Sequence, residues 1–499
     1  MPNSRNNLWG EVPKNAKPRI EPKKSSEHKI DKKWFFAILL AIIVLASAII
    51  INNNYTNNIT TSTGSLDIDN GDLKVNWDKY PTTDIALTDS LTIANSGVYH
   101  LTGSLDDGSI LINAGASGEV KLILDNVSIK NSSSPAIYCI AGDDLVIELV
   151  GENHLSDGSK YSGDLDEDIK GAIYSKADLT FEGNGELTVT ANYQDGIISK
   201  DDLKFNSGTY YVTAVDDGIR GKDSVYIVGG TFDITAKGDG IKSTNETDAG
   251  KGFVLIENGN LTISAGDDGI HAINLLTIQN GSINIAKSYE GLEAQKIIIN
   301  NGEISVVASD DGINAGSGSN NTSNDPMAGD ANCELTINGG NIYVNASGDG
   351  IDSNGYIYFN GGKVVVDGPT NNGNGALDSG LGIIMNGGEV IAAGSSGMAE
   401  TLGDTSSIYN ASIYLSTQQT AGTKIEIKNS NNETIIEHTT AKAFNHIAVG
   451  SAYFKQGETY TIYLNGAKYQ DFTISGIVTT VGNSNSNNMM MPGGPQNRR

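Results

Sequence analysis

Cysteine is scarce in this 499-residue chain, and the residue patterns that mark several enzyme classes are missing. The sequence has no Gly-rich phosphate loop, no nucleophile elbow and no Cys/His cluster with zinc-ligand spacing, and its six histidines are scattered. These absences argue against phosphate-loop enzymes, nucleophile-elbow hydrolases and zinc proteins. Paired carboxylates are plentiful, so a glycoside hydrolase mechanism stays open on the sequence alone.

Positive charge is in short supply after residue 33. Residues 1–33 carry nine Lys/Arg against four acids, a net charge of +5. Because the whole chain has a net charge of −26, the remaining residues have a net charge of −31. A body this acidic repels nucleic acid and anionic lipid, and it attracts divalent cations. We therefore expect no nucleic-acid partner.

Long hydrophobic runs are absent except for one, the eighteen uncharged residues Trp34–Ile51. At about 1.5 Å per residue this run spans roughly 27 Å, which is close to the thickness of a bilayer core. With the basic flank inside, everything after residue 51 lies outside the cell. The alternative is a cleaved signal peptide, because Ala46-Ser47-Ala48 fits a small-residue cleavage site. Both interpretations predict export, and the first predicts a single-pass protein of the cell membrane.

Glycine, in contrast, is abundant, and its spacing reveals a repeat. The tripeptide Asp-Gly-Ile recurs with degenerate copies, and successive copies from Ile197 are 22, 22, 29, 22, 21, 38 and 26 residues apart. A second Gly-containing corner lies ten residues before the Asp-Gly-Ile glycine in six of these periods. A base period near 22 predicts three short strands and three turns per coil, with coils stacked in register.

The corners need glycine or asparagine because sharp turns between strands require a positive φ. Between corners the apolar residues alternate, as in Phe232, Ile234 and Ala236, so every second side chain points inward. We therefore predict an all-β fold, a right-handed parallel β-helix of about ten coils with a small C-terminal β cap. Cys139 and Cys333 would then lie about seven coils apart, too far to form a disulfide, and we expect both to be buried.

The predicted organisation has six segments. Residues 1–33 form a cytoplasmic basic tail, 34–51 a transmembrane signal-anchor helix, 52–74 a linker, 75–405 the β-helix, 406–480 the cap and 481–499 a disordered tail. Two insertions, 243–251 and 316–332, follow the same strand of their coils, so we expect them to project from one edge and to border a groove.

Acidic residues recur at the Asp-Gly-Ile corner, where stacking would place carboxylates about 5 Å apart. Their mutual repulsion has to be offset, and calcium, which gathers six to eight oxygens, is the natural candidate. The simpler interpretation is that aspartate is there only because it suits a tight turn before glycine. The candidate metal ligands are Asp195, Asp216, Asp217, Asp239, Asp267, Asp268, Asp310 and Asp311.

Lysines three residues after the inward isoleucine, and outward tyrosines, are the candidate carbohydrate contacts. Lys200, Arg220 and Lys222 could meet the carboxylate of an acidic sugar bridged by calcium, or they could form a self-neutralising surface ladder with neighbouring aspartates. Tyr226 and Tyr358 fall on the exposed phase of their strands, where sugar rings stack, although tyrosine is also a good strand residue.

Residues 171–244, with the segments SKDDL, GKDSV and GDGIKS, resemble the bacterial carbohydrate-binding β-helix family related to calcium-dependent pectate lyases. The similarity extends from about residue 75 to residue 469. It implies a calcium-binding right-handed β-helix that attaches to cellulose or polygalacturonate and has a lyase-like architecture.

The leading hypothesis is a membrane-anchored extracellular protein that binds polysaccharide without catalysis. The alternative is a calcium-dependent pectate or uronate lyase acting by β-elimination, with calcium acidifying the proton beside the uronate carboxylate and Lys200, Arg220 or Lys222 as base. A purely structural adhesin or stalk is a third possibility.

Overall fold

The computed structural model describes residues 75–162, 165–316 and 329–483. The predicted tail, anchor and linker, and most of the predicted C-terminal tail, lie outside these residues. Within the described ranges no helix is both long and apolar enough to cross a membrane. The only helix described there is a short 3-10 turn, η1 (Trp77–Lys79), and every other element is a strand.

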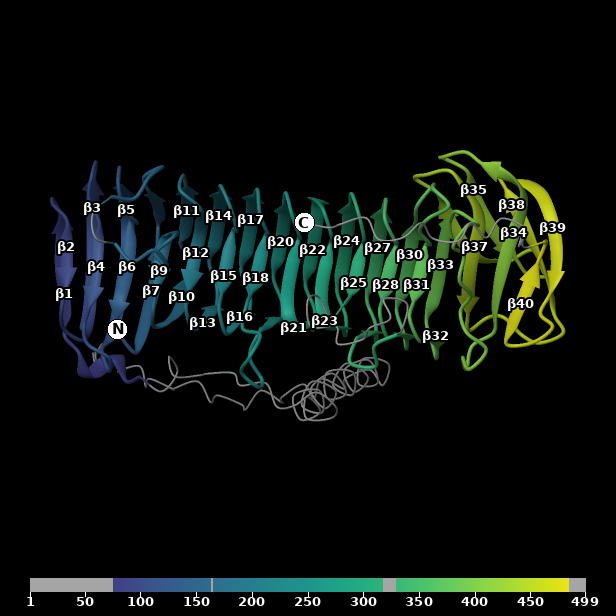
Figure 1. The fold of residues 1–499 in the computed structure, drawn as a ribbon, viewed down its shortest axis with the longest axis horizontal. Helices are drawn as coiled ribbons and strands as arrows, with labels where there is room; N and C mark the ends of the chain where they lie inside the picture. The colour runs from purple at the N-terminus through teal and green to yellow at the C-terminus, as the bar shows by residue number, and fades with distance from the viewer. Residues whose placement is uncertain (1–74, 163–164, 317–328, 484–499) are drawn as a thin grey trace, which may run out of the picture. The chain divides into compact units, whose positions relative to one another are not determined.

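Three parallel ladders of strands build most of the fold, and each coil contributes one strand to each ladder (Figure 1). β3 (Gly97–Leu105) and β5 (Glu119–Lys130) each contribute to ladders II and III, whereas β21 (Ile270–Ile278) and β23 (Leu292–Ile299) each contribute to ladders I and II.

Ladder I consists, besides the first parts of β21 and β23, of β2 (Leu91–Ile93), β4 (Ile110–Asn113), β6 (Ile137–Ala141), β9 (Gly171–Ser175), β12 (Asp195–Ser199), β15 (Ile219–Gly221), β18 (Ile241–Ser243), β25 (Ile313–Ala315), β28 (Ile351–Ser353) and β31 (Leu377–Ser379).

Ladder II consists, besides the shared strands, of β1 (Thr82–Leu87), β7 (Asp144–Val150), β10 (Asp178–Gly183), β13 (Asp202–Phe205), β16 (Ser224–Ile227), β19 (Phe253–Ile256), β26 (Glu334–Ile337), β29 (Tyr356–Phe359) and β32 (Gly382–Met385).

Ladder III consists, besides the second parts of β3 and β5, of β8 (Glu152–Ser156), β11 (Glu186–Ala191), β14 (Thr209–Ala214), β17 (Thr231–Ala236), β20 (Asn260–Ser264), β22 (Ser282–Ser288), β24 (Glu303–Ala308), β27 (Asn341–Ala346), β30 (Lys363–Asp367) and β33 (Glu389–Gly394).

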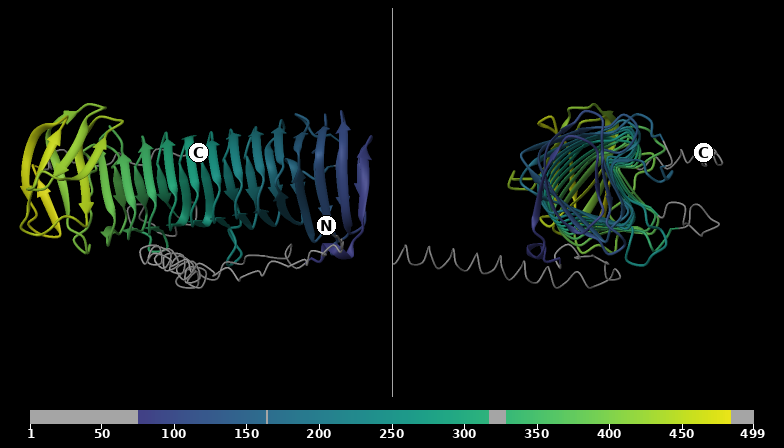
Figure 2. Two further views of the ribbon diagram at one scale, coloured as in Figure 1. Left: turned by 180° about the vertical axis from the view of Figure 1, so that it is seen from behind. Right: turned by 90° about the vertical axis from the view of Figure 1, so that its left-hand side faces the viewer.

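This all-β arrangement, with a long and mostly parallel sheet, is consistent with the predicted β-helix. In Figure 2 (right), which looks along the stack, the strands of successive coils lie behind one another around an enclosed interior. Over the described residues ladder I contains the twelve strands given above, so the predicted number of about ten coils is too low. The first two coils were missed because their corners lack the contiguous Asp-Gly-Ile tripeptide. Before β4, for example, Ser109 separates Asp107-Gly108 from Ile110.

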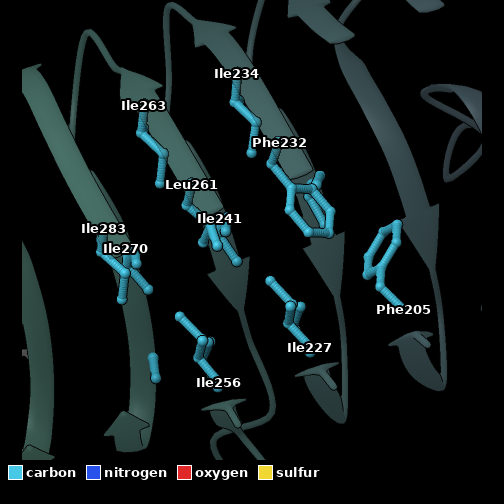
Figure 3. Packing of buried hydrophobic residues seen from close by; sticks show 14 of the residues in the cluster. Phe205, Ile227, Phe232, Ile234, Ile241, Ile256, Leu261, Ile263, Ile270 and Ile283 are labelled. Atoms are coloured by element: carbon cyan, nitrogen blue, oxygen red, sulfur yellow. The ribbon is translucent and has the colours of Figure 1, made fainter. Parts of the chain in front are cut away.

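The core is the column of inward-facing side chains that the alternation predicts (Figure 3). Isoleucines stack on isoleucines, as Ile227 does on Ile256 in the next coil. Aromatic residues fill one stretch, where the Phe205 ring stacks on Phe181 with centroids 5.0 Å apart and meets Tyr210 edge-on at 5.0 Å. Identical positions in successive coils therefore pack against one another.

The two glycine corners have different physical reasons. The corner before ladder III adopts the positive φ that was predicted, for example 119° at Gly230 and 133° at Gly259. The Asp-Gly-Ile glycines are instead required by close approach of the next coil, because a Cβ on Gly196 would lie 2.3 Å from the carbonyl oxygen of Gly218. The expectation of a positive φ is thus wrong for that corner.

Seven strands follow the last coil, and most of them pair antiparallel with a neighbour. They are β34 (Asn410–Gln419), β35 (Lys424–Lys428), β36 (Thr434–Thr439), β37 (Phe444–Ser451), β38 (Thr459–Leu464), β39 (Ala467–Thr473) and β40 (Val478–Val481). β37 pairs antiparallel with β33, the last strand of ladder III, and β36, β35, β38 and β39 form a separate four-stranded sheet. We call β34–β40 the cap.

Cys139 and Cys333 are both free and buried, as predicted. The described parts of the two insertions also follow strands of the same ladder, β18 and β25 of ladder I. The end of the first insertion contacts neighbouring coils, where Lys251 forms ion pairs with Asp202 and Asp223.

Candidate functional site

The predicted column of acids at the Asp-Gly-Ile corner exists, and each member supports the next coil. Asp195 Oδ1 accepts a hydrogen bond from the backbone N–H of Asp217 at 3.2 Å, and Asp217 Oδ1 accepts one from Asp239 at 3.0 Å. The pattern continues from Asp239 to Asp268 at 2.9 Å and from Asp268 to Glu290 at 3.3 Å. We call this set, extended to Asp311 and Asp349, the corner column.

A second column runs beside it, formed by the outward residue three positions after each acid. Register along ladder I aligns Ile198, Arg220, Lys242, His271, Glu293, Asn314, Asp352 and Asp378. We call these residues the flanking column. Its chemistry changes along the stack, from cationic in the middle coils to mostly acidic in the later coils.

The cationic members neutralise the middle of the corner column. Arg220 Nη2 lies 2.9 Å from Asp195 Oδ2 and its Nη1 lies 3.5 Å from Asp217 Oδ2, while Lys242 Nζ pairs with Asp239. The argument that calcium must offset these carboxylates is therefore wrong, because protein cations and backbone N–H groups already do so.

His271 marks the transition between the two halves. Its Nδ1 lies 3.3 Å from Asp268 Oδ2 and 3.3 Å from Glu293 Oε2. Burial lowers the pKa of His271, but the hydrogen bond to Asp268 and the charges of Glu293 and Asp239 outweigh it, so the net pKa is raised. The imidazole therefore favours its charged form in this acidic setting.

Beyond His271 the carboxylates accumulate. Burial raises the pKa of Glu290 to about 7 and that of Glu293 to about 8, with neighbouring carboxylates adding to the effect. Burial and the nearby acids likewise raise the pKa of Asp349 to about 7 and that of Asp352 to about 8. Among the described residues no Lys or Arg forms an ion pair with Glu290, Asp349 or Asp352. Glu290, Asp349 and Asp352 therefore have no Lys or Arg counter-charge in the part of the chain that the structure describes, and their raised pKa values mean that a large part of these carboxyl groups is protonated near pH 7.

The donor set in this region fits a hard cation. Asp268, Glu290 and Glu293 each offer a carboxylate oxygen, and these oxygens lie within 4.8 Å of one another. Oxygens bound to one calcium ion at about 2.4 Å each are at most about 5 Å apart, so the spacing is suitable. The group Asp239, Asp268 and His271 is equally close but includes an imidazole, which suits calcium less well.

A third acidic group occupies the corner between ladders I and II. Asp178, Asp201 and Asp202 offer oxygens within 4.8 Å of one another, and Lys251 from the first insertion lies 3.1 Å from Asp202 Oδ2. Burial and the Asp223 charge raise the pKa of Asp201 to about 6. Because a lysine already enters this cluster, it is a weaker cation site than the later half of the corner column.

The structure separates the predicted carbohydrate contacts. Lys200 Nζ lies 3.6 Å from Asp168 and Lys222 Nζ lies 3.3 Å from Asp223, and both side chains retain solvent access. Arg220 is held between two buried carboxylates, which leaves its guanidinium committed to the fold. Lys200 and Lys222 thus remain candidate contacts, whereas Arg220 has a structural partner.

The tyrosines and the remaining predicted acids lie elsewhere. Tyr226 and Tyr358 share one outward column of ladder II, separated by four intervening strands. The other predicted acids precede the corner column by one residue: Asp216 and Asp267 are exposed and Asp310 is partly exposed. They do not join the buried carboxylates in the ion pairs described above.

Sequence reasoning missed the flanking column. The signal was present, because each member stands three residues after a corner acid, but the column was not followed from coil to coil. Tracing it would have shown the cations Arg220, Lys242 and His271 opposite the first acids, and Glu293 and Asp352 further on.

Comparison with known proteins places these features in a family. A family model described as carbohydrate-binding domain-containing protein matches residues 88–324. A carbohydrate-binding domain-containing protein of Acetivibrio thermocellus is 40% identical over 210 residues, which are 41% of this chain and 73% of that protein. A solved structure titled polysaccharide lyase-like protein from C. thermocellum, a gadolinium derivative, is 36% identical over 41% of this chain and 81% of its own, with a TM-score of 0.37. Since the A. thermocellus relative is matched over most of its length, the chain belongs to the family of carbohydrate-binding domain-containing proteins.

Proposed function

We propose that this protein binds a polysaccharide outside the cell along the edge of the stack that carries the corner and flanking columns. The observation that carries the proposal is that polar side chains from Arg220 to Asp378 stand in register on that edge, one per coil, with a charge that changes from cationic to acidic along it. Such a row, with about 4.8 Å between coils, suits an extended chain ligand that contacts several coils at once.

The ligand is an acidic polysaccharide of the polygalacturonate type, and calcium mediates the contact. A polyuronate is repelled by carboxylates unless a cation lies between the two. Asp268, Glu290 and Glu293 would hold that calcium, which would supply positive charge to sugar carboxylates when bound. Cellulose, which has no carboxylates, is the alternative ligand and needs no such bridge.

Lys200 and Lys222 would assist from the earlier coils, where their ammonium groups are accessible. Their role is to attract the uronate and not to react with it. The uronate lyase remains the second candidate, and the same binding experiment tests it through the unsaturated product that β-elimination leaves.

Attachment to the cell membrane is part of the proposal. The uncharged run Trp34–Ile51 and its basic flank support a single-pass anchor with the β-rich body outside. Tethering would keep the bound polysaccharide at the cell surface.

The test is retention of the purified protein on insoluble polygalacturonate and on cellulose, each with calcium and with chelator. We expect retention on polygalacturonate in calcium, loss of retention in chelator, and no absorbance from unsaturated uronate. Glu290→Gln combined with Glu293→Gln should weaken retention, whereas Asp233→Asn, an exposed surface acid on ladder III, should not.

Three results would contradict the proposal in different ways. Retention that ignores chelator removes calcium from it, and retention on cellulose alone removes the acidic ligand. Steady release of unsaturated product makes the protein a lyase.

A further inference from the structure

A second surface, on ladder III and the cap, has the features of a binding groove. A cavity of about 660 Å³ lies between the outer face of ladder III and the cap. Strands β22, β24, β27 and β30 supply its floor, and Glu437 and His438 of β36 supply its wall. None of the sequence patterns pointed to this place, because the cap strand that closes it comes from a different part of the chain.

The floor presents one set of polar groups per coil. Asn284, Ser305, Tyr343 and Val365 stand in register in one outward column. A second outward column runs beside it and consists of Ser282, Glu303, Asn341 and Lys363. Amides, hydroxyls and charged groups thus recur at the spacing of the coils, with the Tyr343 ring and Val365 providing an apolar patch among them.

The wall of the groove is fixed by a buried anchor. Asp367, with 1% of its surface exposed, lies at the end of β30. Its carboxylate accepts a hydrogen bond from the Tyr343 hydroxyl at 2.9 Å and from the Ala441 N–H at 3.0 Å, and lies 2.9 Å from His438 Nε2. Lys442 adds hydrogen bonds to the carbonyls of Ala346 and Asp367. The cap strand is therefore held against the stack, which makes the groove preformed and lowers the ordering cost of binding.

The charges in the groove are already paired. Lys363 Nζ lies 3.0 Å from Glu389, Glu437 pairs with Lys424 at 2.7 Å, and Glu303 accepts a hydrogen bond from Asn341 at 2.6 Å. A polyuronate would gain little here, because the one lysine in the lining is engaged and Glu303 and Glu437 would repel it. Hydroxyl groups, in contrast, can bond to paired donors and acceptors alike.

We propose that this groove binds an uncharged stretch of polysaccharide, with hydroxyls bonded to the Asn284, Ser305 and Asn341 side chains and a sugar ring against Tyr343. The inference rests on the proposed polysaccharide-binding function but requires no calcium. The protein would then contact two chemically different ligands or two segments of one heterogeneous chain.

The test measures binding of uncharged hexasaccharides of β-1,4-glucan, mannan and xylan to the purified full-length protein in the presence of chelator. Calorimetry should show binding of at least one of them, weakened about tenfold by Tyr343→Ala and several-fold by Asn284→Ala combined with Ser305→Ala. Tyr211→Ala is the matched control, because Tyr211 occupies the same outward column in β14, away from the cap, and should leave the affinity unchanged. Should Tyr343→Ala disturb the Asp367 anchor, the Asn284/Ser305 variant, which leaves that anchor intact, still decides the question.

The outcomes separate this inference from the proposed function. Calcium-dependent retention on polygalacturonate without binding of any neutral hexasaccharide overturns the groove and leaves the acid columns. Neutral binding that chelator abolishes, or that ignores both groove variants, also overturns it. Neutral binding that both groove variants weaken supports the groove even if polygalacturonate fails to bind.

Discussion

Removal of the Lys242 charge from the flanking column should destabilise the fold, because the buried Asp239 carboxylate would lose its ion-pair partner. Lys242→Met deletes the ammonium group that pairs with Asp239, whose side chain is 1% exposed, while it keeps the apolar stem. Breaking a buried ion pair typically costs 3–5 kcal/mol, because it leaves one buried charge uncompensated. Lys242 is itself one quarter exposed and Asp239 keeps its hydrogen bond from the Asp268 N–H, so we expect the lower end, about 3 kcal/mol.

Long repeat arrays often do not unfold in one step, so native-state hydrogen exchange is the suitable assay. The Gly240 N–H, which donates to the Asp268 carbonyl at 2.8 Å, reports opening of this coil. A loss of about 3 kcal/mol corresponds to exchange about a hundredfold faster. Lys237→Met, which removes an exposed lysine from the same coil, is the control and should leave the exchange rate unchanged.

The pH dependence of the stability loss in Lys242→Met tests whether the unpaired Asp239 charge causes it. Burial already raises the pKa of Asp239 to about 6 in the native protein, and loss of Lys242 should raise it further. A carboxyl group whose folded pKa exceeds its unfolded value destabilises the fold increasingly as pH rises through the folded pKa. The deficit of Lys242→Met should therefore be smaller at pH 5 than at pH 8. If exchange in chelator changes less than threefold, or if the deficit is independent of pH, the ion pair does not carry the assigned role.

Three further predictions follow from other features. Phe205→Ala removes a fully buried ring that contacts three others, and should destabilise the stack by about 3–5 kcal/mol, against a smaller loss for Phe205→Leu, as measured by native-state hydrogen exchange. Lys200→Ala combined with Lys222→Ala should weaken retention on polygalacturonate with little change in the melting temperature, since the Lys200–Asp168 pair is largely exposed and the buried Asp223 keeps its hydrogen bond from Asn245. Unchanged retention would remove these lysines from the binding surface. Protease added to intact cells should remove the part of the protein that follows the anchor, and N-terminal analysis of the membrane-bound protein should find residues upstream of Trp34. A mature N-terminus at Ile49 would contradict the anchor.

The repeat made the strand ladders predictable, because in-register stacking follows directly from a constant period. Ile197, Ile219 and Ile241 are 22 residues apart, and they pair as the period requires. The first two coils escaped prediction because β2 and β4 have alternating apolar residues but do not begin with the contiguous Asp-Gly-Ile tripeptide. Coils could therefore be recognised in the sequence only where the Asp-Gly-Ile tripeptide marks the corner.

The candidate site was predictable in part. The column of acids could be located from the repeat. Its neutralisation by Arg220 and Lys242 could not, because it depends on the direction of the outward side chains, and the repeat period does not determine that direction. The groove at the cap was beyond sequence reasoning, since the contact of His438 with Asp367 joins residues 71 positions apart through antiparallel strands with no repeat. Interactions within the repeat could be derived, whereas those between the repeat and the cap could not.

The reversal of strand direction at the end of ladder III has a consequence for solution behaviour. An uncovered parallel strand at the end of such a stack would offer its backbone to the first coil of another molecule, and repeated addition of that kind leads to fibrils. β37 runs antiparallel along β33, from Glu389 opposite Ser451 to Gly394 opposite His446. The cap thus covers the end of ladder III with a strand of the wrong polarity for a further coil, so that this ladder cannot act as a template for another molecule.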